Sequence, residues 1–471
     1  MKNKIIYKYI GKVLIGFSLL QLIPLFVSLF FKESILPFLI PLMISIIVGI
    51  LLNSIKSESK RIYSKDGFFI VALSWIIISL ISALPFVINK DLNYIDALFE
   101  AISGLTTTGA SVFDNVEILN KSILFWRSFM HYIGGMGVLA FVMAIIPLSK
   151  NDKSMHLLKA EMPGPTVSKL VPSIKKTLFY LYLIYILLTT MEFVLLLIGH
   201  LNPFDALLIS FGTAGTGGFS VLRTSLATYS NFAKWVVTIF MFLFGVNFNI
   251  YFLILMKDFK SAIKSEELRT YLIIYLTSTL IIILNTYQMF NNLYECIQQG
   301  FFHISSVITS TGYSIGNIDI YPTNARIVCL FLMLVSACAG STCGGFKMSR
   351  LIICYKSIKR DLLKLIHPNS VRTIKFEEHI IPDDTIKSTR SFLFLYIILI
   401  IIIMFIVSFD GYSLETTINA VFSTFANVGL AFNISSFSIF SDLSKIVLSI
   451  GMLLGRLEIF PIIVLFSDFR K

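Results

Sequence analysis

The chain has 471 residues, of which 56% are hydrophobic and 14% are charged, and its mean hydropathy is +0.82. This composition excludes an ordinary water-soluble domain and indicates a polytopic membrane protein. The net charge of +12 would suit a nucleic-acid partner only if the basic residues formed one patch, whereas they lie between apolar segments.

Ten apolar segments are long enough to cross a bilayer as helices, which takes about 20 residues. The first is too long for a signal peptide and lacks a small-residue cleavage site, so we expect it to be retained. The predicted spans are 9–31, 35–54, 67–88, 122–148, 174–199, 231–256, 268–290, 324–357, 386–408 and 442–467.

The basic residues are distributed unequally between the two sides of these spans. With a cytoplasmic N-terminus, 30 of the 39 lysines and arginines fall on the cytoplasmic side. This asymmetry follows the positive-inside rule, so we expect a multi-pass cell-membrane protein, of the bacterial inner membrane, with both termini in the cytoplasm. Attraction to anionic membrane lipids explains the excess equally well, and no nucleic acid is needed.

Four short stretches between the spans share one pattern. Each has about three apolar turns, too short to span, followed by small, polar and glycine-bearing residues. The second copy fits the others if its helix is one residue shorter. Aligned on Gly109, Gly217, Gly312 and Gly429, they read "ALFEAISGLTTTGA" (97–110), "DALLISFGTAGTGGFS" (205–220), "GFFHISSVITSTGY" (300–313) and "TINAVFSTFANVGL" (417–430). The pattern predicts a duplicated unit of helix, half-helix and helix.

The hydrogen-bonding requirement of the main chain connects this repeat to a pore. Non-helical backbone at membrane depth is tolerated only where protein buries it or where it lines a watery path. Four such segments around one axis would present carbonyl oxygens that replace the hydration shell of potassium. Threonines before the glycine (Thr108, Thr216, Thr311) would add hydroxyls, whereas Val428 makes the ring only pseudo-fourfold. A single copy would more often be a surface turn.

Several phrases carry a family resemblance over nearly the whole chain. They are "TTTGA", "FWRSFMHYIGGMGVLAFVMAIIP" (125–147), "GTGGFS", "GVNFNIYF" (245–252), "AGSTCGGFKMSR" (339–350) and "GRLEIFPIIVLF" (455–466). Together they resemble the Trk, Ktr and HKT superfamily of potassium transporters, and the two additional N-terminal spans look like the TrkH type.

The resemblance implies an all-α polytopic membrane protein with four pseudo-symmetric helix, pore-helix, helix repeats around one central pore. It also implies a homodimer. The corresponding divisions are two extra N-terminal helices (1–66) and pore repeats at 67–176, 177–267, 268–385 and 386–471.

A selectivity filter follows from the same resemblance. Some sodium-selective relatives have serine at the first marker position, where this chain has Gly109, so we expect potassium, with rubidium as a surrogate. The implied filter residues are Thr107, Thr108, Gly109, Ala110, Gly215, Thr216, Gly217, Gly218, Ser310, Thr311, Gly312, Tyr313, Asn427, Val428, Gly429 and Leu430. Potassium is expected at Thr108, Gly109, Thr216, Gly217, Thr311, Gly312, Val428 and Gly429, with no covalent cofactor.

Two features imply a gate below the filter. The small residues of "SACAGSTCGGF" (336–346) have poor helix propensity in what should be mid-span, and the family has a mobile intramembrane loop here. Close helix packing is the alternative explanation. The motif residues are Gly340, Ser341, Thr342, Gly344, Gly345 and Lys347. Arg456, costly within a membrane, is interpreted as an electrostatic barrier, or alternatively as a salt-bridge partner of Glu458.

Other polar residues in the apolar segments receive more ordinary interpretations. We expect Arg127 to be an interface anchor beside Trp126, and Glu192 to pair with a polar neighbour. Asn247 and Asn249 are expected to join helices by hydrogen bonds.

Two other function classes stay open. His131 and His303 would be the bases of an intramembrane enzyme, although neither has a partner at helical spacing. Glu192 and Glu458 would serve a proton- or sodium-coupled symporter. The long charged connection at 347–390 is where we expect a cytoplasmic nucleotide-binding ring protein, a partner that the resemblance implies, to dock.

Overall fold

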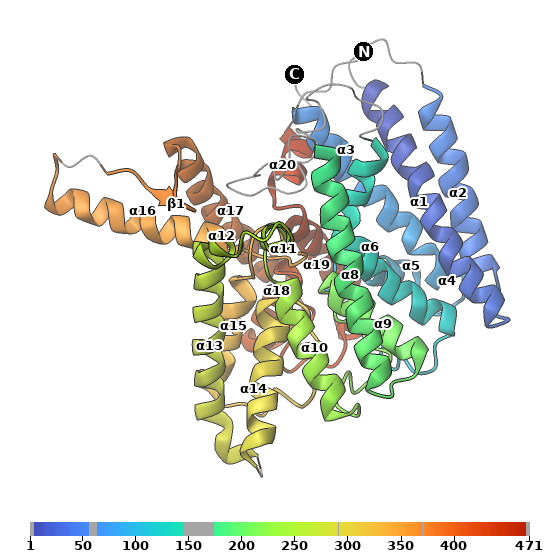
Figure 1. Ribbon diagram of the computed structural model, residues 1–471. Helices are drawn as coiled ribbons and strands as arrows, with labels where there is room; N and C mark the ends of the chain where they lie inside the picture. The colour runs from blue at the N-terminus through green and yellow to red at the C-terminus, as the bar shows by residue number, and fades with distance from the viewer. Residues whose placement is uncertain (1–3, 56–63, 146–173, 291, 370–371, 468–471) are drawn as a thin grey trace.

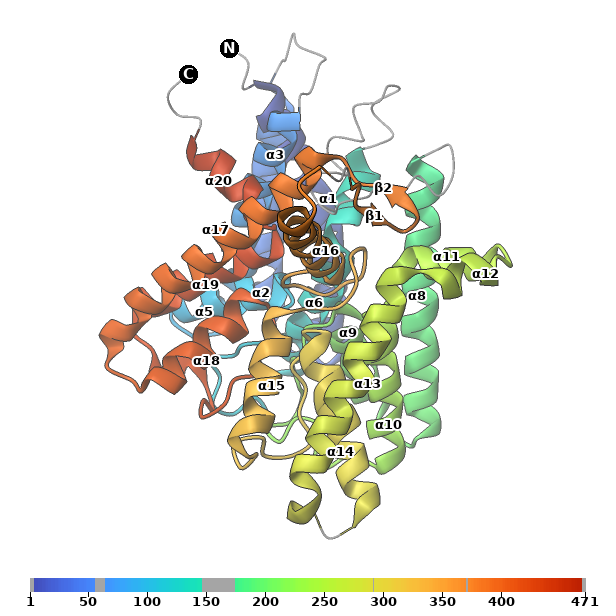
Figure 2. The ribbon, with the colours of Figure 1, turned by 90° about the vertical axis from the view of Figure 1, so that its left-hand side faces the viewer.

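The computed structural model describes residues 4–55, 64–145, 174–290, 292–369 and 372–467. Nearly all of the regular structure is helical, as predicted, and the two short strands β1 (Lys375–Phe376) and β2 (His379–Ile380) form one antiparallel hairpin. The expected cytoplasmic connections at 54–66 and 149–176 lie mostly outside the described residues. The start of α1 (Lys4–Phe30) and α20 (Phe460–Ser467) lie at the same end of the molecule in both views (Figures 1 and 2).

Long apolar helices surround the molecule. Six helices in the described ranges are long and apolar enough to cross a membrane, and a bent pair makes a seventh. Large hydrophobic side chains are exposed on these helices, as for Phe26 at 63% and Phe394 at 67% exposure, which suits helices that face lipid tails. These elements are α1, α2 (Leu36–Asn53), α3 with α4 (Ser64–Ser82, Leu84–Ile88), α8 (Ile174–Ile198), α13 with η2 (Glu266–Thr286, Tyr287–Met289) and α17 with η3 (Asp383–Val407, Ser408–Asp410).

Three of the other four predicted spans are not continuous helices. The fourth is α6 (Lys121–Ile145), which ends at the last residue of a described range. Residues 231–256 form α10 (Asn231–Phe244) and α11 (Phe248–Leu255), which meet at 92°, so the straight span predicted there is wrong. The last span is divided into α19 (Asp442–Arg456) and α20. The break at 336–346 was expected: α15 (Thr323–Leu334) and α16 (Met348–Ile366) flank it.

Contacts from another part of the chain explain the bend between α10 and α11. The carbonyl of Gly245 accepts from Cys338 N at 3.1 Å, and Phe248 N donates to the Gly340 carbonyl at 3.1 Å. The Asn247 side chain caps α11 by accepting from Asn249 N. The backbone groups released by the bend are therefore satisfied by the 335–347 loop.

Four short helices lie inside this frame, one in each predicted repeat. They are α5 (Tyr94–Leu105), α9 (Pro203–Gly215), α14 (Leu293–Ile308) and α18 (Leu414–Phe425). Each begins with a side-chain cap, from Asn93, Asn202, Asn292 and Ser413 respectively. We call them the pore helices.

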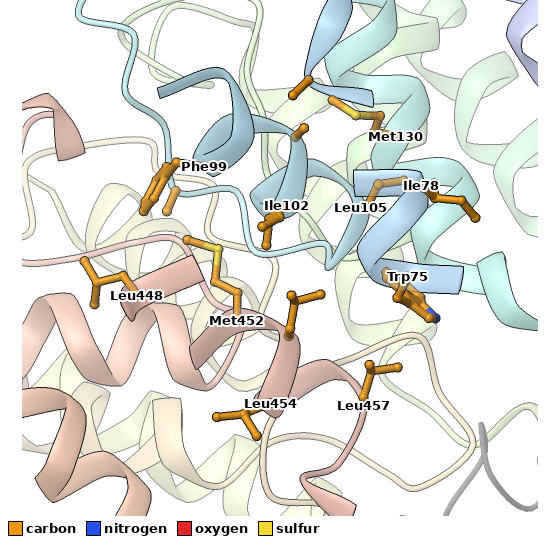
Figure 3. Close-up of a cluster of buried hydrophobic side chains, with 14 of the residues drawn as sticks. Trp75, Ile78, Phe99, Ile102, Leu105, Met130, Leu448, Met452, Leu454 and Leu457 are labelled. Atoms are coloured by element: carbon orange, nitrogen blue, oxygen red, sulfur yellow. The ribbon is translucent and has the colours of Figure 1, made fainter. Parts of the chain in front are cut away.

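Apolar packing joins the first and last repeats. Leu448 and Met452 of α19 lie beside Phe99 and Ile102 of α5 in one buried cluster (Figure 3). Trp75 of α3 belongs to the same cluster. Because residues more than 300 positions apart share this core, the chain closes on itself around the pore helices. The remaining elements, α12 (Phe259–Lys264) and η4 (Phe437–Ile439), are short connectors.

Candidate functional site: a ring of four chain segments

The four pore helices end with the same hydrogen-bonded turn. In each, one residue takes the left-handed conformation, with φ of 56° at Thr107, 54° at Thr216, 52° at Ser310 and 57° at Asn427. The next residue's N–H then donates 2.8 Å to the carbonyl five residues earlier in every copy. This is the Schellman motif, here with threonine, serine or asparagine in the place that glycine usually takes. The four stretches therefore end in the same turn structure, which is consistent with the predicted repeat.

The same geometry corrects the sequence alignment in the second repeat. Two residues after each left-handed residue lies a glycine with φ between 74° and 82°. In the second repeat this glycine is Gly218, so aligning Gly217 with Gly109 was wrong by one residue. The sequence "GTGG" offers two registers, and only the position of the turn decides between them. The counterpart of Thr108 is therefore Gly217, and the counterpart of Thr107 is Thr216.

These four glycines, the ring glycines, make a closed cycle of contacts. A Cβ built on each one would lie about 2 Å from a carbonyl oxygen of the following segment, far inside contact distance. The pairs are Gly109 with Gly217 O (1.9 Å), Gly218 with Thr311 O (1.9 Å), Gly312 with Val428 O (2.1 Å) and Gly429 with Thr108 O (2.1 Å). The four segments therefore meet at one ring in repeat order, and only glycine fits there, for both φ and space.

Hydroxyl groups support the ring from the side. Thr108 Oγ1 lies 2.8 Å from Thr106 Oγ1, and Thr311 Oγ1 lies 2.7 Å from Thr309 Oγ1 in the matching pair. Asn427 Nδ2 donates to Thr108 Oγ1 at 2.9 Å, which joins the fourth segment to the first. All of these side chains are buried.

The remaining predicted filter residues lie beside the ring. Thr216 departs from the prediction, because its hydroxyl donates to Gly215 O and Thr342 O instead of occupying the position of Thr108. Ala110 and Leu430 follow their ring glycines. Tyr313 is fully buried, and its hydroxyl donates to Phe219 O at 3.4 Å, which joins the third and second repeats.

The 335–347 loop holds the predicted gate residues next to the ring. Gly344 N donates to Ser310 Oγ at 3.0 Å, and a Cβ on Gly344 would lie 2.7 Å from the Asn427 side chain. Lys347 is buried and donates to the Cys343 carbonyl within the loop. The loop therefore touches the left-handed residues of the third and fourth segments.

Side chains from other helices hold this loop. Glu267, 3% exposed, accepts from Ala339 N at 2.7 Å and Ser349 N at 3.1 Å, and also from Asn247 Nδ2. Gly340 and Gly345 have φ of 72° and 70°. Ser341 Oγ donates to the Cys338 carbonyl. The sequence analysis missed Glu267, whose only signal was an acidic residue at the start of an apolar span.

Arg456 connects the loop to α6. Its guanidinium donates to Thr342 O at 2.7 Å, to Gly134 O at 2.5 Å and to Gly135 O at 3.1 Å. The alternative salt bridge with Glu458 is not formed, since Glu458 pairs with Arg350 instead. Arg456 thus puts a positive charge at the contact between the loop, α6 and the end of α19.

Arg127 is not the interface anchor that we expected. It is 2% exposed and pairs with Glu100 of α5 at 2.8 Å (Nε to Oε1). It also donates to Ser111 Oγ and the Ser220 carbonyl, while Glu100 accepts from Val112 N. This pair supports the chain just after the ring in two repeats. The sequence analysis missed Glu100, because this acidic residue lies in a half-helix whose other residues are mostly apolar.

The other intramembrane candidates have structural surroundings. His131 and His303 are buried, and His303 Nδ1 lies 2.7 Å from Tyr321 Oη. Glu192 is fully buried, and its carboxylate oxygens make no hydrogen bond of ordinary length to the described residues. Within the described ranges, no group of three His, Cys, Asp or Glu side chains could hold a metal ion.

The helix α16, the β-hairpin and the first turns of α17 project to one side of the ring-bearing part of the chain (Figure 1), and we call them the ledge. Arg390 hydrogen-bonds to Asp361 and lowers the pKa of that carboxyl below its usual range, so the pair fixes α16 to α17. One stripe of α16 exposes large hydrophobic side chains, from 56% at Leu362 to 79% at Leu365, whereas Met348, Ile352 and Ile353 near the start of the helix are buried.

Known proteins resemble this chain over nearly its whole length. Residues 36–470 match the family model TrkH, described as a cation transport protein. The chain is 34% identical over 466 residues to the Trk system potassium uptake protein TrkG of Escherichia coli K12 (96% of this chain, 95% of the relative) and 31% identical over 482 residues to TrkH of the same strain (99% of each). The crystal structure of the potassium transporter TrkH from Vibrio parahaemolyticus superposes with a TM-score of 0.89 at 28% identity, covering 99% of both chains.

Proposed function

Since this chain belongs to the TrkH family of cation transport proteins, we propose that it takes up potassium across the cell membrane through a gated, channel-like filter. The observation that carries this proposal is the ring, in which four glycines each approach a carbonyl oxygen of the next segment. Backbone oxygens arranged around one axis can replace the water shell of a dehydrated monovalent cation. The pore helices direct their partly negative C-terminal ends to the same region, which favours a cation there.

The corrected register defines the ion-binding residues of the proposal. In the first, third and fourth repeats, potassium contacts the predicted pairs, namely Thr108 with Gly109, Thr311 with Gly312 and Val428 with Gly429. In the second repeat the pair moves to Gly217 and Gly218, since these residues occupy the equivalent turn. Rubidium, of similar size and charge, serves as the measurable surrogate.

The 335–347 loop and Arg456 form the proposed gate. The loop touches the ring segments from one side, and Arg456 places a fixed positive charge against it. A cation leaving the filter would meet this charge, so its position opposes flux until the loop moves. Glu267 and Arg456 hold the loop by side-chain contacts to its backbone, and neither contact involves a pore helix.

Proton- or sodium-coupled symport is the second candidate. One observation favours it: Glu192 is a fully buried acid without an ordinary hydrogen bond in the described structure. Dependence of rubidium flux on a proton or sodium gradient in liposomes would select the symporter, and flux without either gradient would select the channel. An enzymatic role has less support, because the relatives are named as potassium uptake proteins.

The proposed assembly uses the ledge. We assign the exposed apolar stripe of α16 to a second copy of this chain, because it is too apolar to face water in a monomer. The charged residues of 347–390 would receive a cytoplasmic nucleotide-binding ring protein. Both termini would lie in the cytoplasm, which agrees with α1 starting and α20 lying at one end of the molecule (Figure 2).

Gly312→Ser tests the filter directly. The added Cβ would lie 2.1 Å from Val428 O at a φ of 81°, so we expect potassium-limited growth and rubidium uptake to fall by about tenfold or more in cells lacking their own uptake systems. Gly411→Ser is the matched control, because Gly411 has a φ of 78° but its added Cβ meets nothing within 4 Å. Equal rescue by wild type and Gly312→Ser at equal expression would refute the filter.

A further inference from the structure

Gly217 is a glycine for a different reason from the ring glycines. Gly217 is not in the left-handed conformation, so a positive φ is not what requires glycine here. A Cβ at this position would instead lie 2.3 Å from Cγ and 2.4 Å from Nδ1 of His131. The equivalent positions in the other repeats carry side chains: Thr108, Thr311 and Val428. An imidazole therefore occupies the space that a filter side chain takes elsewhere.

His131 comes from α6 of the first repeat and is held on several sides. It is fully buried, and its ring stacks on Phe219 with 4.2 Å between centroids and 22° between planes. Phe219 N donates to Nδ1 at 3.4 Å, and the buried Nε2 has no hydrogen-bond partner among the described residues. The main chain of His131 also contacts the second segment, because a Cβ on Gly215 would lie 2.2 Å from its carbonyl oxygen.

The other face of Phe219 carries Arg127. The guanidinium carbon lies 4.1 Å from the ring centroid, within the range of a cation–π contact. Arg127 and His131 are one helical turn apart on α6, so they hold Phe219 between them. Phe219 directly follows the ring glycine Gly218. This stack therefore fixes the chain on the outgoing side of the ring, while the imidazole packs against Gly217.

We propose that His131 replaces the missing filter side chain of the second repeat and is a specificity-determining positioning residue for the ion path. It touches Gly217 and not the ion, and it acts by holding the Gly217 carbonyl, which contacts Gly109 in the ring. The inference rests on the proposed function only for the identity of the ion. That the imidazole of His131 fills the space of a side chain at position 217 can be tested by stability measurements alone, without ion transport.

The test adds a side chain at position 217, removes the imidazole at position 131, and then combines the two changes. Gly217→Thr places a side chain on top of the imidazole, so we expect rubidium uptake to fall by about tenfold or more and the melting temperature in detergent to drop. His131→Ala should lower rubidium uptake less than Gly217→Thr does, and it should lower the ratio of rubidium to sodium affinity by about threefold or more, because Gly217 is no longer held. The double variant, with a threonine at 217 as in the first and third repeats, should regain most of the uptake and stability lost in Gly217→Thr.

His303→Ala is the matched control. His303 is also a fully buried histidine, but it bonds Tyr321 and contacts no glycine of the second repeat. Adding His303→Ala to Gly217→Thr should therefore restore neither uptake nor stability. A double variant no better than Gly217→Thr would overturn the inference, and so would an unchanged ion ratio in His131→Ala. Wild-type chain that transports no rubidium would instead overturn the proposed function, while recovered stability in the double variant would still support the packing relation.

Discussion

The ring and the 335–347 loop are neighbours that are held together in different ways. The ring is built from main-chain geometry used four times: a left-handed residue, a six-residue turn and a glycine against the next carbonyl. The loop occurs once, and besides backbone bonds such as Phe248 N to Gly340 O it is held by side chains of Glu267 and Arg456 that bond to its backbone. Each turn of the ring is formed within its own segment, whereas part of what holds the loop is lost when either side chain is changed. That difference suits a rigid filter beside a movable gate.

The largest effect is expected where a side chain, and not the backbone, supports the ring. Arg127→Met leaves the buried Glu100 charge unpaired, which costs about 3–5 kcal/mol of stability. We expect a large loss of folded protein and of rubidium uptake, with partial recovery in Arg127→Met/Glu100→Gln because no charge is then left buried. Thermal unfolding in detergent, together with uptake per folded molecule, measures both.

Lys445→Gln provides the comparison for this pair. Lys445 of α19 bonds Asp96 at 2.6 Å, and the two side chains are 6% and 17% exposed. Asp96 lies on the same pore helix as Glu100 but one turn further from the ring. It should lower stability and leave the ratio of rubidium to sodium uptake unchanged. If Arg127→Met behaved in the same way, the pair would be structural only and the ring would depend on its backbone alone.

An intermediate effect is expected at the loop. Arg456→Ala removes the charge and its bond to Thr342 O, an interaction worth about 1.5–3 kcal/mol, so rubidium flux should rise by about tenfold or more while the fold is kept. Arg456→Lys retains the charge but not the three-way bonding, and its flux should lie between the two. Uptake unchanged in Arg456→Ala at equal expression would mean that the loop is not held by this residue.

The smallest effect is expected where the two regions are joined at the surface. Arg326 at the start of α15 bonds Glu415 of α18 at 2.6 Å, with side chains 24% and 50% exposed. Pairs of this kind contribute about 0–1 kcal/mol, so Arg326→Gln should change rubidium flux by less than about twofold. A clear gain of flux would show that α15 transmits strain from the pore helix to the loop.

The sequence analysis was most reliable for features that depend on nearby residues. The four half-helices were recognisable because a three-turn apolar run ends in residues suited to turns, and the break at 336–346 because its residues are poor helix formers. It was wrong where distant residues decide. Gly245 to Asn247 ends a helix because the loop around Cys338 and Gly340 receives the freed backbone groups. Arg127 looked interfacial because its partner Glu100 lies on another helix.

By itself, the sequence determined that this is a multi-pass helical membrane protein with four half-helices, because span length and turn chemistry are local properties of a chain in lipid. Only the tertiary structure decided the register of the second repeat, where two consecutive glycines are equivalent until His131 and Thr311 contact one each. It also decided which carbonyl each ring glycine meets and which charges pair. These outcomes depend on the packing of residues far apart in the chain, and no local pattern carries that information.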